Sequence, residues 1–467
     1  MRRFPQPLLD ELTADPARIV FEHGERRVSA AELLATIRRM AGGLKAAGLR
    51  PASGVAMLTS TTPEAFAAYI AANTIGCRVV GIRPGYSQGQ LEHMMKAGVD
   101  AVVTDGTIAQ LNRSVPIDVC AGGRPNDAAR LVYTSGSTGT PKGCVQTFRA
   151  MSAHWSWTPE MRDEDIDDLA ACGERYLLSG TLASAVVQDF AALALMAGGT
   201  AVIPDHDEPL PYLVQRYRIT GATVDVPRLY QFLDIERTDD VDTSSLKGMA
   251  VVGSPLPPQR LKEAYDRLGP VVYQAYGQSE TGNLTMLTPR HLETYGPDVL
   301  STVGRPHSHV DIAVRAGELV ARTRYQMSGY WQDAEQTADV IAGDWVRTRD
   351  LGDLDPHGFV RLTGRARDVI IVNAYPYYAG PIEAVLARQP GIRQAYVVGT
   401  PDEQTGEAVH AFVVPGWGHT PSDAVLRDAV RTRLGEGSVP KTITYLAAVP
   451  VAHSGKPDKR ALRASLR

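Results

Sequence analysis

The chain has 467 residues, of which 44% are hydrophobic and 21% charged, so it can bury a large core and is long enough for more than one domain. Lysines and arginines number 48 against 52 aspartates and glutamates, a net charge of −4 without a dense basic block, which disfavours nucleic-acid partners. We expect neither export nor a membrane span, because the N-terminus has no apolar signal core and the most apolar stretch, 176–199, contains Gln188 and Asp189. The four cysteines are widely spaced, which favours a cytoplasmic protein.

Strands and helices are predicted to alternate through the first two thirds of the chain. Residues 54–60 and 77–82 are apolar β-branched runs, and the segment between them, 63–76, has the apolar spacing of a helix. This alternation predicts an α/β architecture. Further strands are predicted at 100–105, 200–205, 222–227, 248–254 and 271–277, and a further helix at 258–268.

The pattern changes after about residue 310. Short, hairpin-like apolar runs follow one another, and a helical pattern covers residues 422–434. This part of the chain predicts a smaller α+β unit at the C-terminus. Its predicted strands lie at 317–323, 358–365, 368–372, 394–400 and 408–415.

Two polar clusters invite a metal-binding interpretation, DHDE at 205–208 and HSH at 307–309. Neither cluster has the partner residues at the spacing that zinc or calcium loops require. We therefore expect both to be surface turns. Trp155, Trp157 and the run 176–190 are pocket candidates, but buried structural residues are the favoured interpretation for them.

The segment TSGSTGTPKG, residues 134–143, follows the strand-like run at 130–133. Glycines let backbone N–H groups turn toward an anion, hydroxyls can donate hydrogen bonds, and a lysine adds positive charge. The loop is not a Walker A motif, because Thr140 and Pro141 separate Gly139 from Lys142. A flexible surface loop would suit its composition as well.

Further motifs decide between these interpretations. They are YGQSETG at 276–282, GRP at 304–306, TRDLGD at 348–353, GRARDVI at 364–370 and SGKPDKR at 454–460. Together with the loop, this ordered set resembles the adenylate-forming superfamily, which contains acyl-CoA synthetases, adenylation domains and luciferases, and the resemblance covers essentially the whole chain. It implies an enzyme that joins a carboxylate to the α-phosphate of ATP, releases pyrophosphate, and passes the acyl group to a nucleophile.

The resemblance also implies a fold and a set of site residues. The fold would be a large N-terminal α/β domain of layered sheets and helices, 1–366, that binds ATP and acid, and a small mobile C-terminal α+β domain, 367–467, that carries a catalytic lysine. The active site would lie between them. The ATP site would include Thr134, Ser135, Gly136, Ser137, Thr138, Gly139 and Lys142 of the loop, together with Tyr276, Asp350 and Arg365.

Individual roles follow from the same resemblance. Thr281 would contact the α-phosphate, and Glu280 would hold Mg²⁺ on the triphosphate, as a single protein carboxylate often does for this ion. Tyr276 would lie near the adenine, and Asp350 would accept hydrogen bonds from the ribose hydroxyls. The family usually has glycine where Arg349 stands, so the turn at Asp350 is expected to differ.

The C-terminal part would supply the moving groups. Lys456 would bridge the carboxylate and the α-phosphate during adenylation, since an ammonium can neutralise both partners as they approach. Arg367 occupies the position of the hinge, and Arg365 would reach the ribose or the phosphates. A large rotation of the small domain would then exchange Lys456 for the turn at 372–378 between the two half-reactions.

The sequence departs from the family pattern around the acceptor. Ala374 falls where CoA-using members place the glycine that lines the pantetheine tunnel, and its methyl group occupies room there. Phe148 replaces a histidine found in many members, and no aspartate stands in the F-D-x-S context that amino-acid-activating domains use. Activation of an apolar or aromatic acid is favoured over loading of an amino acid.

Several functions stay open. We favour a ligase that transfers the acyl group from acyl-AMP to an amine, forming an amide without CoA. The alternative is an acyl-CoA ligase that uses the CoA thiol. A third possibility is a nucleotide-binding protein without turnover, which the retained Lys456, Glu280 and Asp350 argue against. Light-producing oxidation of the adenylate is a fourth, found in few members of the superfamily.

Overall fold

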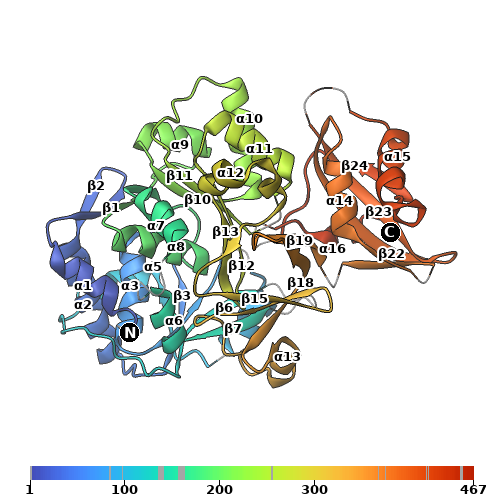
Figure 1. Ribbon diagram of the computed structural model, residues 1–467. Coiled ribbons are helices and arrows are strands. Elements are labelled where there is room, and N and C mark those ends of the chain that lie inside the picture. The colour runs from blue at the N-terminus through green and yellow to red at the C-terminus, as the bar shows by residue number, and fades with distance from the viewer. Residues whose placement is uncertain are drawn as a thin grey trace.

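The computed structural model describes residues 3–466 except 84, 85, 97, 135–140, 156–162, 254, 255, 366, 367, 374, 417, 419 and 453–455. A large N-terminal domain of layered sheets and helices lies beside a smaller C-terminal domain (Figure 1). Strand β19 (Val360–Arg365) and helix α16 (Lys459–Ala464) lie where the two domains meet in this view. The α/β fold with a small C-terminal domain is as predicted.

The largest sheet has nine strands in the order β14-β13-β12-β11-β10-β8-β9-β1-β2. Its central strands β12, β11, β10, β8 and β9 pair in parallel, which brings their carboxyl ends to one edge. The strands are β1 (Ile19–His23), β2 (Arg26–Ser29), β8 (Arg175–Leu177), β9 (Thr200–Ile203), β10 (Gly221–Asp225), β11 (Gly248–Val252), β12 (Val272–Gln278), β13 (Gly282–Leu287) and β14 (Arg305–Pro306).

A second sheet of five strands has the order β5-β3-β4-β6-β7. Strands β3, β4, β5 and β6 are parallel, and β7 returns antiparallel to β6, so the segment between these two strands contains the glycine-rich loop. The strands are β3 (Gly54–Leu58), β4 (Arg78–Gly81), β5 (Ala101–Thr104), β6 (Ala128–Thr134) and β7 (Lys142–Thr147).

Helices cover these parallel strands and complete the core. Helix α3 (Pro63–Thr74) is buried along nearly its whole length, and Phe66 packs on Phe21 of β1 with ring centroids 5.4 Å apart. Ser29 and Glu32 form a capping box that starts α2 (Ala30–Ala46). The others are α1 (Gln6–Ala14), α4 (Gln88–Met95), α5 (Asp105–Leu111), α6 (Phe148–Trp155), α7 (Glu164–Ala171), α8 (Ala185–Met196), α9 (Leu210–Tyr217), α10 (Val226–Thr238), α11 (Pro258–Leu268), α12 (Pro289–Tyr295) and α13 (Ala334–Val340).

A third sheet, β15-β16-β18-β17 with β19 paired to β18, closes the large domain on the side of the small one. Its remaining strands are β15 (Asp311–Arg315), β16 (Glu318–Arg322), β17 (Ile341–Ala342) and β18 (Trp345–Leu354). The small domain has its own core around Ile370, Ile382 and Val397. It is built from β20 (Val369–Val372), β21 (Tyr375–Tyr378), α14 (Ala379–Ala387), β22 (Ile392–Asp402), β23 (Gly406–Pro415), α15 (Asp423–Leu434) and β24 (Thr442–Tyr445).

The strands and helices predicted from the pattern are present within a few residues of their expected bounds. The exposed polar turn at 205–208 is confirmed. The prediction of a surface turn at 307–309 is wrong about exposure, because His307 is only 2% exposed and is paired inside the protein. Trp155 and Tyr176 are buried, as favoured, whereas Trp157 lies outside the described residues. In the described part of the chain, no helix is long and apolar enough to cross a membrane.

Candidate active site

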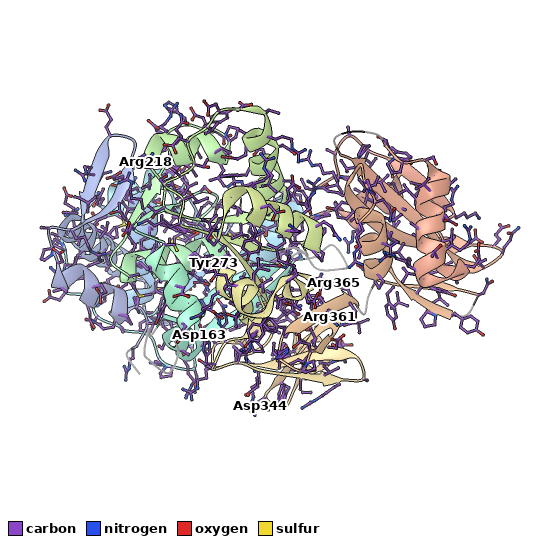
Figure 2. All side chains as sticks on the ribbon, turned by 45° about the horizontal axis from the view of Figure 1, so that its top comes forward. Asp163, Arg218, Tyr273, Asp344, Arg361 and Arg365 are labelled. Atoms are coloured by element: carbon purple, nitrogen blue, oxygen red, sulfur yellow. The ribbon has the colours of Figure 1, made fainter. Side chains whose placement is uncertain are left out.

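The predicted motif residues converge where the large sheet, the third sheet and the small domain meet. Strand β12 ends at Gln278, and Glu280 follows in the turn to β13. Asp350 lies in β18 directly opposite Arg365 of β19. Figure 2 shows Arg365 between the two domains. The carboxyl edge of a parallel sheet is where α/β proteins bind ligands.

Asp350 is the buried centre of a hydrogen-bond network. Its side chain is 5% exposed, and its Oδ2 accepts hydrogen bonds from the Tyr276 hydroxyl at 2.8 Å and from Gln278 Nε2 at 2.6 Å. Its Oδ1 lies 3.0 Å from Arg365 Nε. Burial and the Asp350 carboxylate raise the pKa of Tyr276 well above its usual value, so the phenol remains a donor. These contacts fix the carboxylate in one orientation.

In the turn before Asp350, arginine stands where the family usually has glycine. Arg349 has a φ of 59°, in the left-handed region that glycine adopts without strain. Its N–H donates to Glu318 Oε1 at 3.0 Å, and its guanidinium pairs with Asp339. The turn therefore keeps a glycine-like backbone, which these contacts hold in place.

Glu280 faces a tyrosine and a lysine. The Tyr330 hydroxyl donates to Glu280 Oε1 at 2.8 Å, and Lys142 Nζ lies 5.3 Å from the centre of the Tyr330 ring. Burial, with Glu280 next to it, raises the pKa of Tyr330, so it donates at neutral pH. Lys142 and Glu280 both lie near enough to the buried Cys144 of β7 to act electrostatically on its thiol.

Lys456 approaches the carboxylates of Glu280 and Asp350 from the small domain. It lies on a short hairpin in which Val451 pairs with Pro457 and the Ala452 N–H donates to the Lys456 carbonyl at 2.8 Å. Solvent reaches the side chain, yet the surrounding protein and Arg365 lower the pKa of Lys456, while Glu280 and Asp350 raise it. The structure therefore brings Lys456 together with Glu280, Asp350 and Arg365.

Thr281 lies in the same turn as Glu280. Its side chain has no exposed surface, and its hydroxyl donates to the Gly282 carbonyl at 3.0 Å and lies 3.3 Å from the Gln278 N–H. In this structure the Thr281 hydroxyl is used within its own turn, and its role at the α-phosphate stays a prediction. Ser279, two residues earlier in the same turn, is half-buried.

Other predicted site residues lie outside the described residues. They are Ser135, Gly136, Ser137, Thr138 and Gly139 of the loop, Arg367 at the expected hinge and Ala374 in the expected acceptor turn. Thr134 ends β6, and Lys142 begins β7.

Magnesium fits the site if a single protein carboxylate holds it together with substrate phosphates and water. Among the described residues, no group of three or more histidine, cysteine, aspartate or glutamate side chains could enclose a metal ion. Magnesium is commonly held by one or two carboxylates plus substrate phosphates and water. Glu280 matches this pattern, and bound there the ion would neutralise phosphate charge.

Sequence reasoning missed a buried polar network behind β13. His307 Nδ1 lies 2.9 Å from Asp163 Oδ2, and His307 Nε2 lies 3.0 Å from Asn283 Nδ2, on the strand that follows the Glu280 turn. The Tyr325 hydroxyl donates to the Asn283 carbonyl. The signal available in the sequence was the HSH cluster itself, but its partner Asp163 is 144 residues away and only the fold brings it close.

Comparisons with known proteins agree with this geometry. Residues 10–331 match the family described as AMP-binding enzyme, and 381–456 match the AMP-binding enzyme C-terminal domain. Among solved structures, the amide bond synthetase McbA from Marinactinospora thermotolerans is 30% identical, with a TM-score of 0.87 over 98% of this chain and 99% of that one.

Similar characterised proteins include a feruloyl-CoA synthase from Amycolatopsis sp, 28% identical over 94% of both chains. A 2-succinylbenzoate–CoA ligase from Geobacillus kaustophilus is 28% identical over 99% of this chain and 98% of its own. Family matches that span most of the chain, and the motif residues gathered around Glu280 and Asp350, lead to one conclusion. The chain belongs to the AMP-binding family of adenylate-forming ligases.

Proposed function

We propose that this ligase activates an aromatic or apolar carboxylic acid as acyl-AMP and transfers the acyl group to an amine. The observation that carries the adenylation half is the gathering of Lys456, Glu280, Asp350 and Arg365 at one place. Glu280 follows a strand of the largest sheet, Asp350 lies in the third sheet, and Lys456 lies in the small domain. A nucleotide with its triphosphate would account for the charges gathered there. This gathering supports a role for Lys456 in the first half-reaction.

The residue roles are proposed as follows. Lys456 neutralises the carboxylate and the α-phosphate as the carboxylate oxygen attacks phosphorus and pyrophosphate leaves. Glu280 holds Mg²⁺, and Tyr330 keeps its carboxylate oriented. The loop residues Thr134 to Gly139 and Lys142 hold the leaving pyrophosphate. At the α-phosphate we propose Thr281, with the less buried Ser279 of the same turn as a second candidate.

Asp350 is proposed to bind the ribose. Both of its carboxylate oxygens are already engaged, by Tyr276 and Gln278 on one side and by Arg365 on the other. Arg365 has a side chain that is 57% exposed, so it is the partner that can move most easily. We infer that ribose hydroxyls take its place on Asp350 while the guanidinium turns toward the phosphates. Tyr276 then borders the adenine through its ring and not through its hydroxyl.

The domain division is proposed at 366/367. Strand β19 ends at Arg365 in the large domain, and β20 begins the small-domain sheet at Val369. Asp368 and Glu383 both pair with Lys459, so the small domain is tied together immediately after this point. A hinge at Arg367 would let the small domain turn as one unit and exchange the Lys456 hairpin for the β20–β21 hairpin.

An amine acceptor is favoured over CoA by that second hairpin. Val372 pairs with Tyr375, and the sequence has alanine at position 374, where CoA-using members of the family place the tunnel glycine. Asn373 has a φ of 51°, and Ala374 follows in the sequence. The likeness to an amide bond synthetase over nearly the whole chain supports the same acceptor. The likeness to several acyl-CoA ligases keeps CoA as the second candidate.

The test is an acceptor assay on the purified protein. ATP and a panel of aromatic and fatty acids are incubated with a simple primary amine, with CoA, or with neither, and products are identified by mass spectrometry. We expect AMP, pyrophosphate and an amide in the amine reaction without CoA. Acyl-CoA as the sole product would establish the second candidate. Ala374→Gly, assayed in parallel, would gain CoA activity if the methyl group blocks the tunnel.

A further inference from the structure

We propose that Arg83 is a further ATP-binding residue, whose guanidinium contacts the triphosphate beside the glycine-rich loop. None of the motifs identified in the sequence contains it. It follows β4, the strand next to the one that leads into the loop. The inference concerns the adenylation half-reaction and is independent of which acceptor takes the acyl group.

Strand register places Arg83 at the entrance of the loop. In the parallel pair of β4 and β6, Val80 stands opposite Leu131. The strand geometry continues past the end of β4, because the Ile82 N–H donates to the Met57 carbonyl at 3.0 Å. Ile82 also shares a buried cluster with Leu131 and Tyr133 of β6. Continuing the register by three residues sets Arg83 beside Thr134, about 5 Å away across the sheet.

The Arg83 charge lies near the reaction centre. The side chain is half-buried, and its charge is near enough to Lys456 to help lower the pKa of that ammonium. In the described part of the chain, no carboxylate lies within ion-pair distance of Arg83. A half-buried arginine without such a partner is unusual, because guanidinium charge is normally paired when it leaves water.

Several cations gather at this site. Arg83, Arg365 and Lys456 lie near Glu280 and Asp350, and Lys142 and Glu280 both lie near Cys144. Asp350 is already paired with Arg365. A triphosphate carries several negative charges, and arginine presents its N–H groups in a fork that matches two phosphate oxygens.

The alternative ligand is the carboxylate of the acid substrate. The register favours ATP, because Arg83 extends the strand that lies alongside the loop entrance, whereas Lys456 reaches the centre from the opposite domain. A carboxylate carries one negative charge, whereas a triphosphate can pair with several of these cations at once. The two ligands are separated by measuring ATP binding without acid.

The experiment compares Arg83→Gln with Arg83→Lys and with Arg361→Gln. Arg361 lies in β19, four residues before Arg365, and its side chain is 44% exposed (Figure 2). Arg361→Gln therefore changes the net charge of the protein by the same amount as Arg83→Gln, at a position outside the proposed ATP site. Binding of a non-hydrolysable ATP analogue and of adenosine is measured by calorimetry. Adenosine has no phosphate and reports whether the nucleoside site is folded.

We expect Arg83→Gln to weaken binding of the ATP analogue by about tenfold or more, the loss typical of one charge-assisted hydrogen bond, with adenosine binding unchanged. Arg83→Lys should recover part of the loss, and Arg361→Gln should behave as wild type. The KM for the acid should stay the same. ATP-analogue binding within about twofold of wild type would overturn the proposal. So would an equal loss in Arg361→Gln, or a rise in the acid KM with ATP binding intact.

Discussion

Asp163→Asn should remove most of the stabilisation that the buried network behind β13 contributes. Asp163 caps α7 by accepting a hydrogen bond from the Ile166 N–H at 3.0 Å, and its other oxygen binds His307 Nδ1 and the Ser308 N–H. Asparagine keeps the size of the side chain and an oxygen for the helix cap. The substitution therefore tests the negative charge beside His307.

The magnitude follows from the pKa of Asp163. Burial by itself would raise that pKa, but the hydrogen bond and charge of His307 outweigh burial and lower it to about 2, from an ordinary value of 3.8. A difference of about 1.8 units corresponds to roughly 2 kcal/mol of folding free energy. Because the folded-state pKa is the lower one, this stabilisation is complete above pH 5 and disappears as the pH falls toward 2. About half should remain near pH 3.

The assay is urea unfolding followed by tryptophan fluorescence at pH 7 and at pH 3. Asp225→Asn is the matched control, because Asp225 caps α10 in the same way, through the Arg228 N–H at 3.0 Å. We expect Asp163→Asn to cost roughly 2 kcal/mol at pH 7, with the difference from wild type about halved at pH 3. The control should cost about 1 kcal/mol or less. A cost for Asp163→Asn that is the same at both pH values would refute the electrostatic reasoning.

Three further substitutions test the site and the fold. Lys456→Ala should reduce pyrophosphate exchange by about a hundredfold or more while sparing reaction of a synthetic acyl-adenylate, and equal losses in both assays would contradict the division of labour. Tyr330→Phe removes the donor to Glu280 and should lower adenylation about tenfold, with a higher magnesium requirement in the same exchange assay; an unchanged magnesium dependence would exclude the orienting role. Gly304→Ala should cost more than about 2 kcal/mol in chemical unfolding, because φ is 89° and the new methyl would lie 2.0 Å from the backbone of β13. Gly269→Ala, at a φ of 76° with open space around it, is its control and should cost about 1 kcal/mol.

The sequence by itself determined the architecture and the chemistry of the motifs. Apolar β-branched runs such as 248–252 must be buried on both faces, so their alternation with helical segments could be recognised without the fold. The ordered motifs around Lys142, Glu280, Asp350 and Lys456 indicated adenylation through their resemblance to the adenylate-forming superfamily. Local patterns are sufficient where a few adjacent residues decide the structure.

The tertiary structure decided what distant residues do to one another. Thr281 and Ser279 are two positions apart and both carry hydroxyls, yet Thr281 is fully buried and Ser279 only half-buried. His307 became a core residue because Asp163, far away in the sequence, supplies the hydrogen-bond partner that its buried ring needs. Arg83 gained a place in the ATP site only through the pairing of β4 with β6. Exposure, pairing of buried charge and strand register depend on long-range contacts, which no local pattern encodes.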